Sequence, residues 1–168
     1  MRFIDVIGYS GSGKTYFIMK IIELLRFQLG FNIAVMKNVK QHQIDEEGKD
    51  SNIFTKSGAN YSIIQNEKHE MAIFLKAEEI TFDKLIKWLE QGPYKIDIVI
   101  SEGFRNLNHP TVLCVSNRDE IKPQMTNNIK MISGIICTKS KVEDIPSNIP
   151  LINIDKEFEI FLKIFKIR

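Results

Sequence analysis

The chain begins with a short hydrophobic run, residues 3–7, that stops at a glycine-rich octet. Such a run is typical of a buried strand that leads into a loop. After the octet, hydrophobic residues recur with the three- and four-residue spacing of one helix face, and Gly30 follows the last of them. These residues are Phe17, Ile18, Ile21, Ile22, Leu25 and Leu29. The pattern predicts a strand, a loop and an amphipathic helix in succession.

The middle of the chain predicts smaller elements around a polar segment. Residues 32–37 predict a second strand, and the polar residues that follow, up to Ser51, predict a long loop. Residues 51–58 predict a short helix, and residues 61–65 and 71–76 predict a pair of antiparallel strands. Thr81 is expected to cap a helix that ends at Gly92.

The last part of the chain returns to hydrophobic runs rich in β-branched residues. Strands are predicted at residues 96–100, 111–115, 132–137 and 151–154, and a final helix carries Phe158, Phe161, Leu162 and Phe165. Alternating strands and helices predict one α/β domain over residues 1–168, with a doubly wound, mainly parallel sheet in three α/β/α layers. The middle strand pair is expected to form an antiparallel edge of that sheet.

Composition limits the classes of partner. The 23 basic and 21 acidic side chains leave a formal charge of +2, so neither nucleic acid nor a membrane is expected as a partner. No apolar segment approaches the roughly 18 residues that span a bilayer, and no signal peptide is expected. Cys114 and Cys137 each lie in an apolar run, as buried cysteines do in a reducing compartment. These features predict a cytoplasmic protein.

The octet carries the clearest chemistry. Its sequence is Gly8-Tyr9-Ser10-Gly11-Ser12-Gly13-Lys14-Thr15, which matches the phosphate-binding pattern G-x-x-x-x-G-K-[ST]. Glycine lets backbone N–H groups wrap closely around phosphate oxygens, Lys14 would reach the β- and γ-phosphates, and the Thr15 hydroxyl would bind Mg²⁺. The strand before the octet and the helix after it are the context that this pattern requires. We predict a P-loop NTPase-like fold that binds a purine triphosphate with Mg²⁺.

Two carboxylates are candidates to complete the site. Glu102 follows the predicted strand at residues 96–100, where such sites place a residue that holds the metal or orients water. Asp50 lies in the polar loop with His42, and is a candidate for the same catalytic and metal-binding work. Residues 45–48 match D-x-x-G, a short pattern with little specificity. Asp5, inside the first strand, is a weaker candidate, and His109 is expected at the surface.

Four stretches together resemble the molybdopterin-guanine dinucleotide biosynthesis protein B family, GTP-binding adapters of molybdenum cofactor maturation. They are residues 8–15; Gly48-Lys49-Asp50-Ser51 with Ser57-Gly58-Ala59; residues 99–105; and the closing strand and helix from Pro150. The Lys-His pair and further histidines of that family have only Lys37-Asn38 and His42 as counterparts here. The resemblance implies GTP and Mg²⁺ binding, slow hydrolysis, a homodimer, partnership with the molybdenum cofactor guanylyltransferase, and molybdopterin as a further possible ligand.

The residues themselves leave the choice of base open. GTPases commonly read guanine with an Asn/Thr-Lys-x-Asp segment, and here Thr138-Lys139-Ser140-Lys141 has lysine in place of the aspartate. A lysine has no acceptor for the guanine N–H groups. GTP is therefore expected from the resemblance alone.

Two functions remain as alternatives. The first is an adapter in which bound GTP orders the polar loop and presents a surface to a partner enzyme. The second is a small-molecule or nucleoside kinase, with Asp50 or Glu102 as its base. Kinases of this kind usually carry several arginines on a lid, whereas residues 117–128 contain only Arg118 and Lys122 as basic side chains. Arg105 is the arginine nearest to Glu102 in the sequence. The adapter is favoured.

Overall fold

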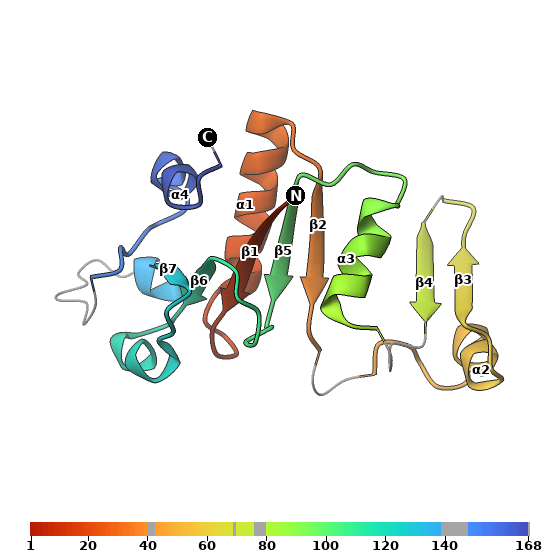
Figure 1. Cartoon of the computed structure of the whole chain (residues 1–168). Coiled ribbons are helices and arrows are strands. Elements are labelled where there is room, and N and C mark those ends of the chain that lie inside the picture. Colours follow the sequence, from red (N-terminus) through yellow and green to blue (C-terminus); the bar gives the residue numbers. More distant parts are fainter. Residues whose placement is uncertain (40–42, 69, 76–79, 139–147, 168) are drawn as a thin grey trace. The chain divides into compact units, whose positions relative to one another are not determined.

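The computed structural model describes residues 1–39, 43–68, 70–75, 80–138 and 148–167. Contacts divide the chain into two compact units (Figure 1). The first unit comprises Met1–Asn38 and Lys95–Arg168, and the second comprises Val39–Tyr94. That the whole chain acts as one nucleotide-binding domain stays a prediction.

The first unit is built on a five-stranded parallel sheet in the order β2-β5-β1-β6-β7. Its strands are β1 (Arg2–Ile7), β2 (Ile33–Lys37), β5 (Ile98–Glu102), β6 (Thr111–Cys114) and β7 (Ile129–Ser133). The chain fills the side of β1 that holds β5 and β2 before it crosses to the side of β6 and β7. The carboxyl end of β1 therefore lies at the point where the strand order reverses, which is where open α/β sheets bind ligands.

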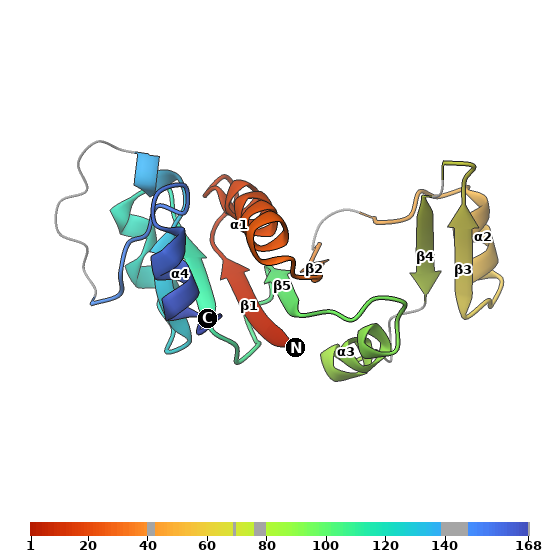
Figure 2. The same ribbon diagram turned by 90° about the horizontal axis from the view of Figure 1, so that it is seen from above.

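Helices α1 (Lys14–Leu29) and α4 (Phe158–Ile164) share one hydrophobic core with the sheet (Figure 2). Phe17 of α1 and Phe161 of α4 meet edge to face, with ring centroids 6.2 Å apart. Alternate strand residues such as Ile4 and Ile100 are almost fully buried in the same cluster. The predicted α/β fold with a mainly parallel sheet is confirmed, and Gly30 ends α1 as expected.

A second, smaller core includes residues of β6 and β7 that alternate with those of the main core. Leu113 and Ile132 pack there with Ile121 and Ile136. Three 3-10 helices accompany this part of the chain: η1 (Arg118–Glu120), η2 (Lys122–Gln124) and η3 (Ile135–Thr138). Cys114 is buried, as predicted, and this burial raises the pKa of its thiol to about 12. Cys137 is only half-buried, and both cysteines are free.

Two predicted strands are wrong in extent. The run at residues 132–137 is a strand only up to Ser133, because Gly134 adopts a φ of +101° and turns the chain into η3. The run at residues 151–154 forms a single bridge, from Leu151 to Ile132. Pairing stops there because β7 itself ends at Ser133, and Ile152 O, which would accept the next ladder bond, accepts from the Ser133 hydroxyl at 2.8 Å.

Asp5 and His109 form a polar cluster around β1. Asp5 is 1% exposed and accepts a hydrogen bond from the Ser101 hydroxyl. The His109 ring nitrogen Nδ1 lies 3.3 Å from the same Asp5 oxygen, and the ring stacks on Phe3 with centroids 4.5 Å apart. His109 therefore reaches the surface, as expected, but its side chain is only 25% exposed.

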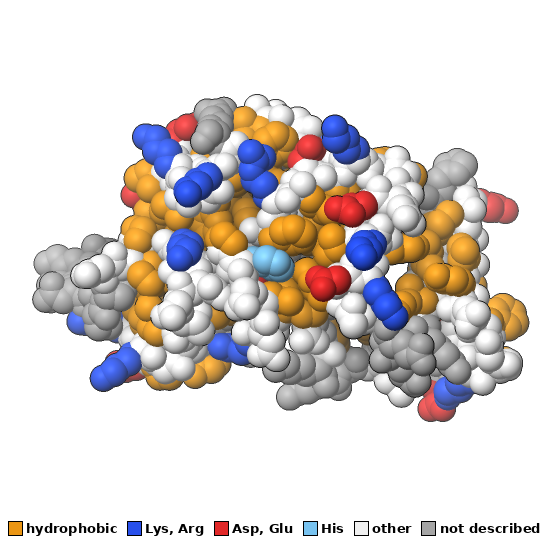
Figure 3. Space-filling view, in the orientation of Figure 1, with side chains coloured by type: hydrophobic (Ala, Val, Ile, Leu, Met, Phe, Trp, Pro, Cys, Tyr) orange, Lys and Arg blue, Asp and Glu red, His pale blue; other side chains and the backbone are white. Residues whose placement is uncertain are grey.

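The second unit contains α2 (Asp50–Lys56), β3 (Tyr61–Gln65), β4 (Met71–Leu75) and α3 (Phe82–Glu90). The predicted antiparallel pairing of β3 and β4 is confirmed, but the pair forms a two-stranded sheet of its own and not an edge of the parallel sheet. Alternation along a strand identifies its faces but not the neighbour that it pairs with. Thr81 caps α3 through a hydrogen bond from Lys84 N. Figure 3 shows hydrophobic side chains at the surface over this hairpin.

Within the described ranges, no helix combines the length and the apolar character needed to cross a membrane.

We predict that Gly134→Ala destabilises the fold far more than Gly30→Ala. Both glycines have positive φ and would strain an alanine by about 1–2 kcal/mol. A Cβ at Gly30 meets open space, whereas a Cβ at Gly134 would lie 2.4 Å from Ser12 O and 2.9 Å from Val115 N. Overpacking adds about 1–3 kcal/mol more. Urea unfolding measures the free energy of unfolding of both variants. Equal losses of stability would show that the backbone around Gly134 shifts to admit a Cβ at little cost.

Candidate functional site

The loop between β1 and α1 is pressed against the end of β6. A Cβ built on Gly8 would lie 2.2 Å from the Cys114 carbonyl oxygen and 2.6 Å from Ser12 Oγ. No side chain fits there, which explains glycine at the first position of the octet. Gly8 follows β1 directly, so the loop stands at the carboxyl end of the central strand.

The amino end of α1 is open to an anion. Gly13 is its N-cap and makes no side-chain capping bond, and the first turn holds no acidic residue. The N–H groups of the first turn and the positive end of the helix dipole are therefore left to be satisfied by another group. Ser12 is fully buried, and its hydroxyl has no hydrogen-bond partner among the residues that the structure describes. These features fit a loop that binds phosphate.

Lys14 holds its charge directly over the loop. Its ammonium group donates to the carbonyl oxygens of Gly8, at 3.1 Å, and Tyr9, at 2.8 Å. An ammonium group has three donors, so one remains for a ligand. Thr15 follows in the first turn and is exposed to solvent. Ser10 and Gly11 are also exposed, and the Ser116 hydroxyl donates to Gly11 O at 3.3 Å.

Glu102 ends β5 beside this loop. In the sheet it is paired in register with Val6, and the next residue, Gly103, donates its N–H to Val6 O at 3.1 Å. Its side chain is only 12% exposed, and Lys37 Nζ lies 3.4 Å from its Oε2. The sequence did not indicate Lys37 as its partner, because the two residues become neighbours only through the register of β2 and β5.

Asp50 belongs to the second unit, where it is the first residue of α2. Asp45, in the D-x-x-G match, accepts a hydrogen bond from the Ser51 hydroxyl at 2.8 Å, so this carboxylate organises the start of α2. His42 and residues 139–141 lie outside the described residues. A metal-binding role for Asp50 stays a prediction.

The described residues contain no cluster of three or more His, Cys, Asp or Glu side chains that could hold a metal ion. Mg²⁺ does not need such a cage, because it is usually held by one or two carboxylates together with substrate phosphates and water. The separate placement of Thr15 and Glu102 around the loop is compatible with that mode of binding.

Arg105 lies beside Tyr9 of the loop. Its guanidinium group is 5.9 Å from the centre of the Tyr9 ring and donates to Gln124 Oε1 at 2.7 Å. Gln124 is buried, so the arginine is anchored at one end while its side chain as a whole is exposed. This contact holds the Arg105 guanidinium next to Tyr9.

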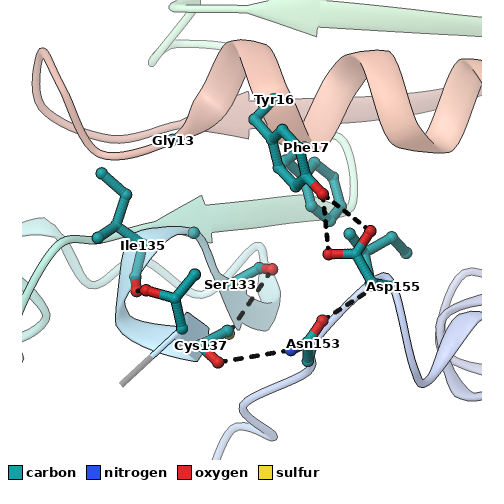
Figure 4. A pocket seen from close by; sticks show the side chains of 11 residues that line it. Gly13, Tyr16, Phe17, Ser133, Ile135, Cys137, Asn153 and Asp155 are labelled. Atoms are coloured by element: carbon teal, nitrogen blue, oxygen red, sulfur yellow. Dashed lines mark hydrogen bonds between the residues drawn. The ribbon is translucent and has the colours of Figure 1, made fainter. Parts of the chain in front are cut away.

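A pocket of about 200 Å³ opens beside the first turn of α1 (Figure 4). The Tyr16 hydroxyl reaches across it to both oxygens of Asp155, at 3.0 and 3.1 Å. This hydrogen bond raises the pKa of Tyr16, so the phenol stays protonated and donates at neutral pH. No motif in the sequence connects these two residues, which are 139 positions apart.

Comparison with solved structures agrees with the fold. A MobB protein homolog from Bacillus stearothermophilus matches with a TM-score of 0.71 at 19% identity, over 100% of both chains. Bacillus subtilis MobB matches with a TM-score of 0.74 at 22% identity, over 98% of both chains. At this level of identity the match shows a shared architecture.

Curated relatives are similar over most of this chain. A provisionally named molybdopterin-guanine dinucleotide biosynthesis adapter protein of Methanocaldococcus jannaschii is 30% identical over 124 residues, which is 71% of this chain and 49% of that protein. The molybdopterin-guanine dinucleotide biosynthesis adapter protein of Haemophilus influenzae is 30% identical over 112 residues, 66% of this chain and 61% of its own length. The chain thus spans about half to three fifths of these relatives.

A family model described as molybdopterin guanine dinucleotide synthesis protein B matches residues 3–138. This range includes the glycine-rich loop at residues 8–15, Asp50 and Glu102, and covers most of the 168 residues. The chain belongs to the molybdopterin guanine dinucleotide synthesis protein B family.

Proposed function

We propose that this protein is a GTP-binding adapter with slow GTPase activity, which assists the attachment of GMP to molybdopterin by a guanylyltransferase. The observation that carries the proposal is the loop at residues 8–15, which stands at the carboxyl end of the central strand and leads into a helix whose amino end is uncapped. Membership of the family supports the biosynthetic role.

The loop supports triphosphate binding through its backbone and through Lys14. Backbone N–H groups and the positive end of α1 attract phosphate oxygens without a side chain. The Lys14 ammonium adds a full charge at the same place, already oriented by two carbonyl groups of the loop. In this proposal Lys14 contacts the β- and γ-phosphates, and the loop surrounds the β-phosphate.

Mg²⁺, when bound, would neutralise charge on the β- and γ-phosphate oxygens. Thr15 and Glu102 are the residues of the first unit that would hold it, with Asp50 as a further candidate. Lys37 balances the Glu102 carboxylate in the structure, and a buried carboxylate needs such a partner. Metal binding would replace the charge of Lys37 with that of the cation.

Slow hydrolysis is supported by the placement of Arg105, the arginine described beside the loop. A positioned arginine contributes about 10³–10⁵ to the rate of phosphoryl transfer. Arg105 donates to Gln124 and lies beside Tyr9, and slow hydrolysis requires that this placement keeps its guanidinium off the γ-phosphate. Slow hydrolysis keeps GTP bound for a long time, which suits an adapter whose GTP-bound conformation is recognised by its partner.

A homodimer is supported by one face of the hairpin. Tyr61, Ile63, Met71 and Ile73 are all exposed. In the β3–β4 register Ile63 lies opposite Ile73, and Met71 lies opposite Gln65, so these side chains share one face. A two-stranded sheet with an apolar face is marginal alone, and a second copy would cover it. We call these four residues the hairpin face.

The proposed role predicts that Lys14→Ala loses both GTP binding and stimulation of the guanylyltransferase. Binding should weaken by about 2–5 kcal/mol, the cost of removing one partner of a desolvated charged contact. Calorimetry with GTP and Mg²⁺ measures the affinity, and an assay of guanine dinucleotide formation measures the stimulation. Lys20→Ala is the control, because Lys20 lies on the same helix, paired with Glu23. Unchanged GTP affinity in Lys14→Ala would sink the proposal.

Glu102→Gln should reduce the gain in GTP affinity that Mg²⁺ provides by about 10- to 100-fold, the usual loss when a group that supports a metal is altered. The amide keeps the size of the side chain and removes the charge. Titration of GTP with and without Mg²⁺ separates this effect from phosphate binding. If GTP affinity falls by the same factor with and without Mg²⁺, Glu102 supports the fold of the site and does not bind the metal.

Ile63→Lys should convert the proposed homodimer into a monomer of 19.5 kDa, because a charge on the hairpin face opposes its burial. Ile64→Lys is the matched control, since it adds the same charge to the neighbouring residue of the same strand, which is 41% exposed and lies on the other face. Analytical ultracentrifugation reads the mass of both. A wild-type chain that sediments as a monomer would refute the dimer, and a dimeric Ile63→Lys would place the interface elsewhere.

A further inference from the structure

The pocket beside α1 shares its walls with the phosphate-binding loop. Gly13, the N-cap of α1, lines it, and so do Tyr16 and Phe17 of the first turn. The opposite wall is Ile135, whose N–H donates to Ser12 O at 3.2 Å. A nucleotide whose phosphates lie on the loop would therefore have this pocket within reach of its base.

The lining suits a flat ring with one polar edge. Tyr16, Ile135 and Ile154 supply apolar surface, and the Tyr16 ring projects into the space in Figure 4. The volume of about 200 Å³ is below the roughly 300–1,000 Å³ of pockets that enclose drug-sized ligands. It matches a part of a ligand, such as a heterocyclic base, better than a whole nucleotide.

Asp155 is the one charged residue in the described lining of this pocket. Its neighbour Asn153 is already engaged: the Asn153 amide donates to Cys137 O at 3.4 Å, and its oxygen accepts from Asp155 N at 3.1 Å. The Asp155 carboxylate accepts from the Tyr16 hydroxyl and is exposed. Asn153 thus positions a carboxylate whose two oxygens can be offered to a ligand.

We propose that this pocket holds the purine base and that Asp155 selects guanine; this inference rests on the proposed nucleotide-binding function. A carboxylate accepts hydrogen bonds and donates none. The Watson–Crick edge of guanine offers two adjacent donors, N1–H and the 2-amino group, which match the two oxygens of Asp155. Adenine has a lone pair at N1 and no 2-amino group, so the same carboxylate repels it. The Tyr16 hydroxyl releases Asp155 when the base enters.

The inference also accounts for the lysine at position 141. Thr138, the first residue of the segment that replaces the usual guanine-reading motif, lines the same pocket. Its hydroxyl donates to Ile135 O at 2.8 Å, which stabilises the end of η3. An aspartate that enters the pocket from the segment before α4 supplies the acceptors that the motif lacks.

Asp155→Asn tests the selection, because the amide keeps the size and can still accept from Tyr16. Calorimetry with Mg²⁺ and each of GTP, inosine triphosphate, xanthosine triphosphate and ATP gives four affinities per variant. We expect Asp155→Asn to bind GTP about 10- to 100-fold more weakly, the range for lost hydrogen bonds to a charged group. Xanthosine triphosphate should bind better than to the wild type, since the amide N–H₂ can donate to its 2-oxo group. Asp119→Asn, another exposed aspartate, is the control.

Tyr16→Phe separates base reading from folding. If Asp155 binds the base, removing the competing hydroxyl in Tyr16→Phe leaves GTP affinity equal or higher. If Asp155 only anchors Tyr16, Tyr16→Phe and Asp155→Asn both lose GTP and ATP affinity to the same extent, and the inference fails. Unchanged nucleotide preference in Asp155→Asn, with Lys14→Ala still unable to bind, would overturn the inference and leave the proposed function intact. A wild-type chain that binds none of the four triphosphates would overturn both.

Discussion

The site depends on backbone packed against backbone where three segments meet. Ser12 O accepts from Ile135 N, Gly134 has no room for a Cβ beside Ser12 O, and Gly8 lies against the Cys114 carbonyl. Main-chain atoms cannot avoid a clash by changing rotamer, so these contacts set the loop, the end of β6 and the turn after β7 in one arrangement. The loop at residues 8–15 and the pocket beside it are two sides of that junction.

The charged side chains around this junction are arranged in a way that suits binding of a nucleotide more than its rapid hydrolysis. Lys14 lies over the loop, Glu102 is balanced by Lys37, and Arg105 is tied to Gln124. Each charged group has a partner in the structure, so binding exchanges one partner for another instead of exposing an unpaired charge. Such an arrangement is compatible with an adapter whose nucleotide-bound form lasts long enough for a partner enzyme to bind it.

The hairpin shows how local pattern and wider context differ. Alternation and turn residues were sufficient to predict that β3 and β4 pair with each other, because neighbouring strands pair through a short connection. They were not sufficient to predict a separate two-stranded sheet, since every strand edge offers the same backbone donors and acceptors. The strand predicted at residues 151–154 is wrong for a similar reason: its neighbour β7 turns away after Ser133, and the Ser133 hydroxyl takes the Ile152 carbonyl oxygen that a longer ladder would need.

The sequence by itself determined the glycine-rich loop between a strand and a helix, α1 with its glycine end and the α/β class, because these follow from local spacing and residue type, and four stretches identified the family by resemblance. It also placed Glu102 at the end of a strand. Only the tertiary structure decided that Lys37 faces Glu102, that Asn153 holds Asp155 in place, and that Asp155 meets Tyr16 across a pocket. Those contacts join residues far apart in the chain, and sheet register and helix packing bring them together without leaving a repeat or a spacing in the sequence.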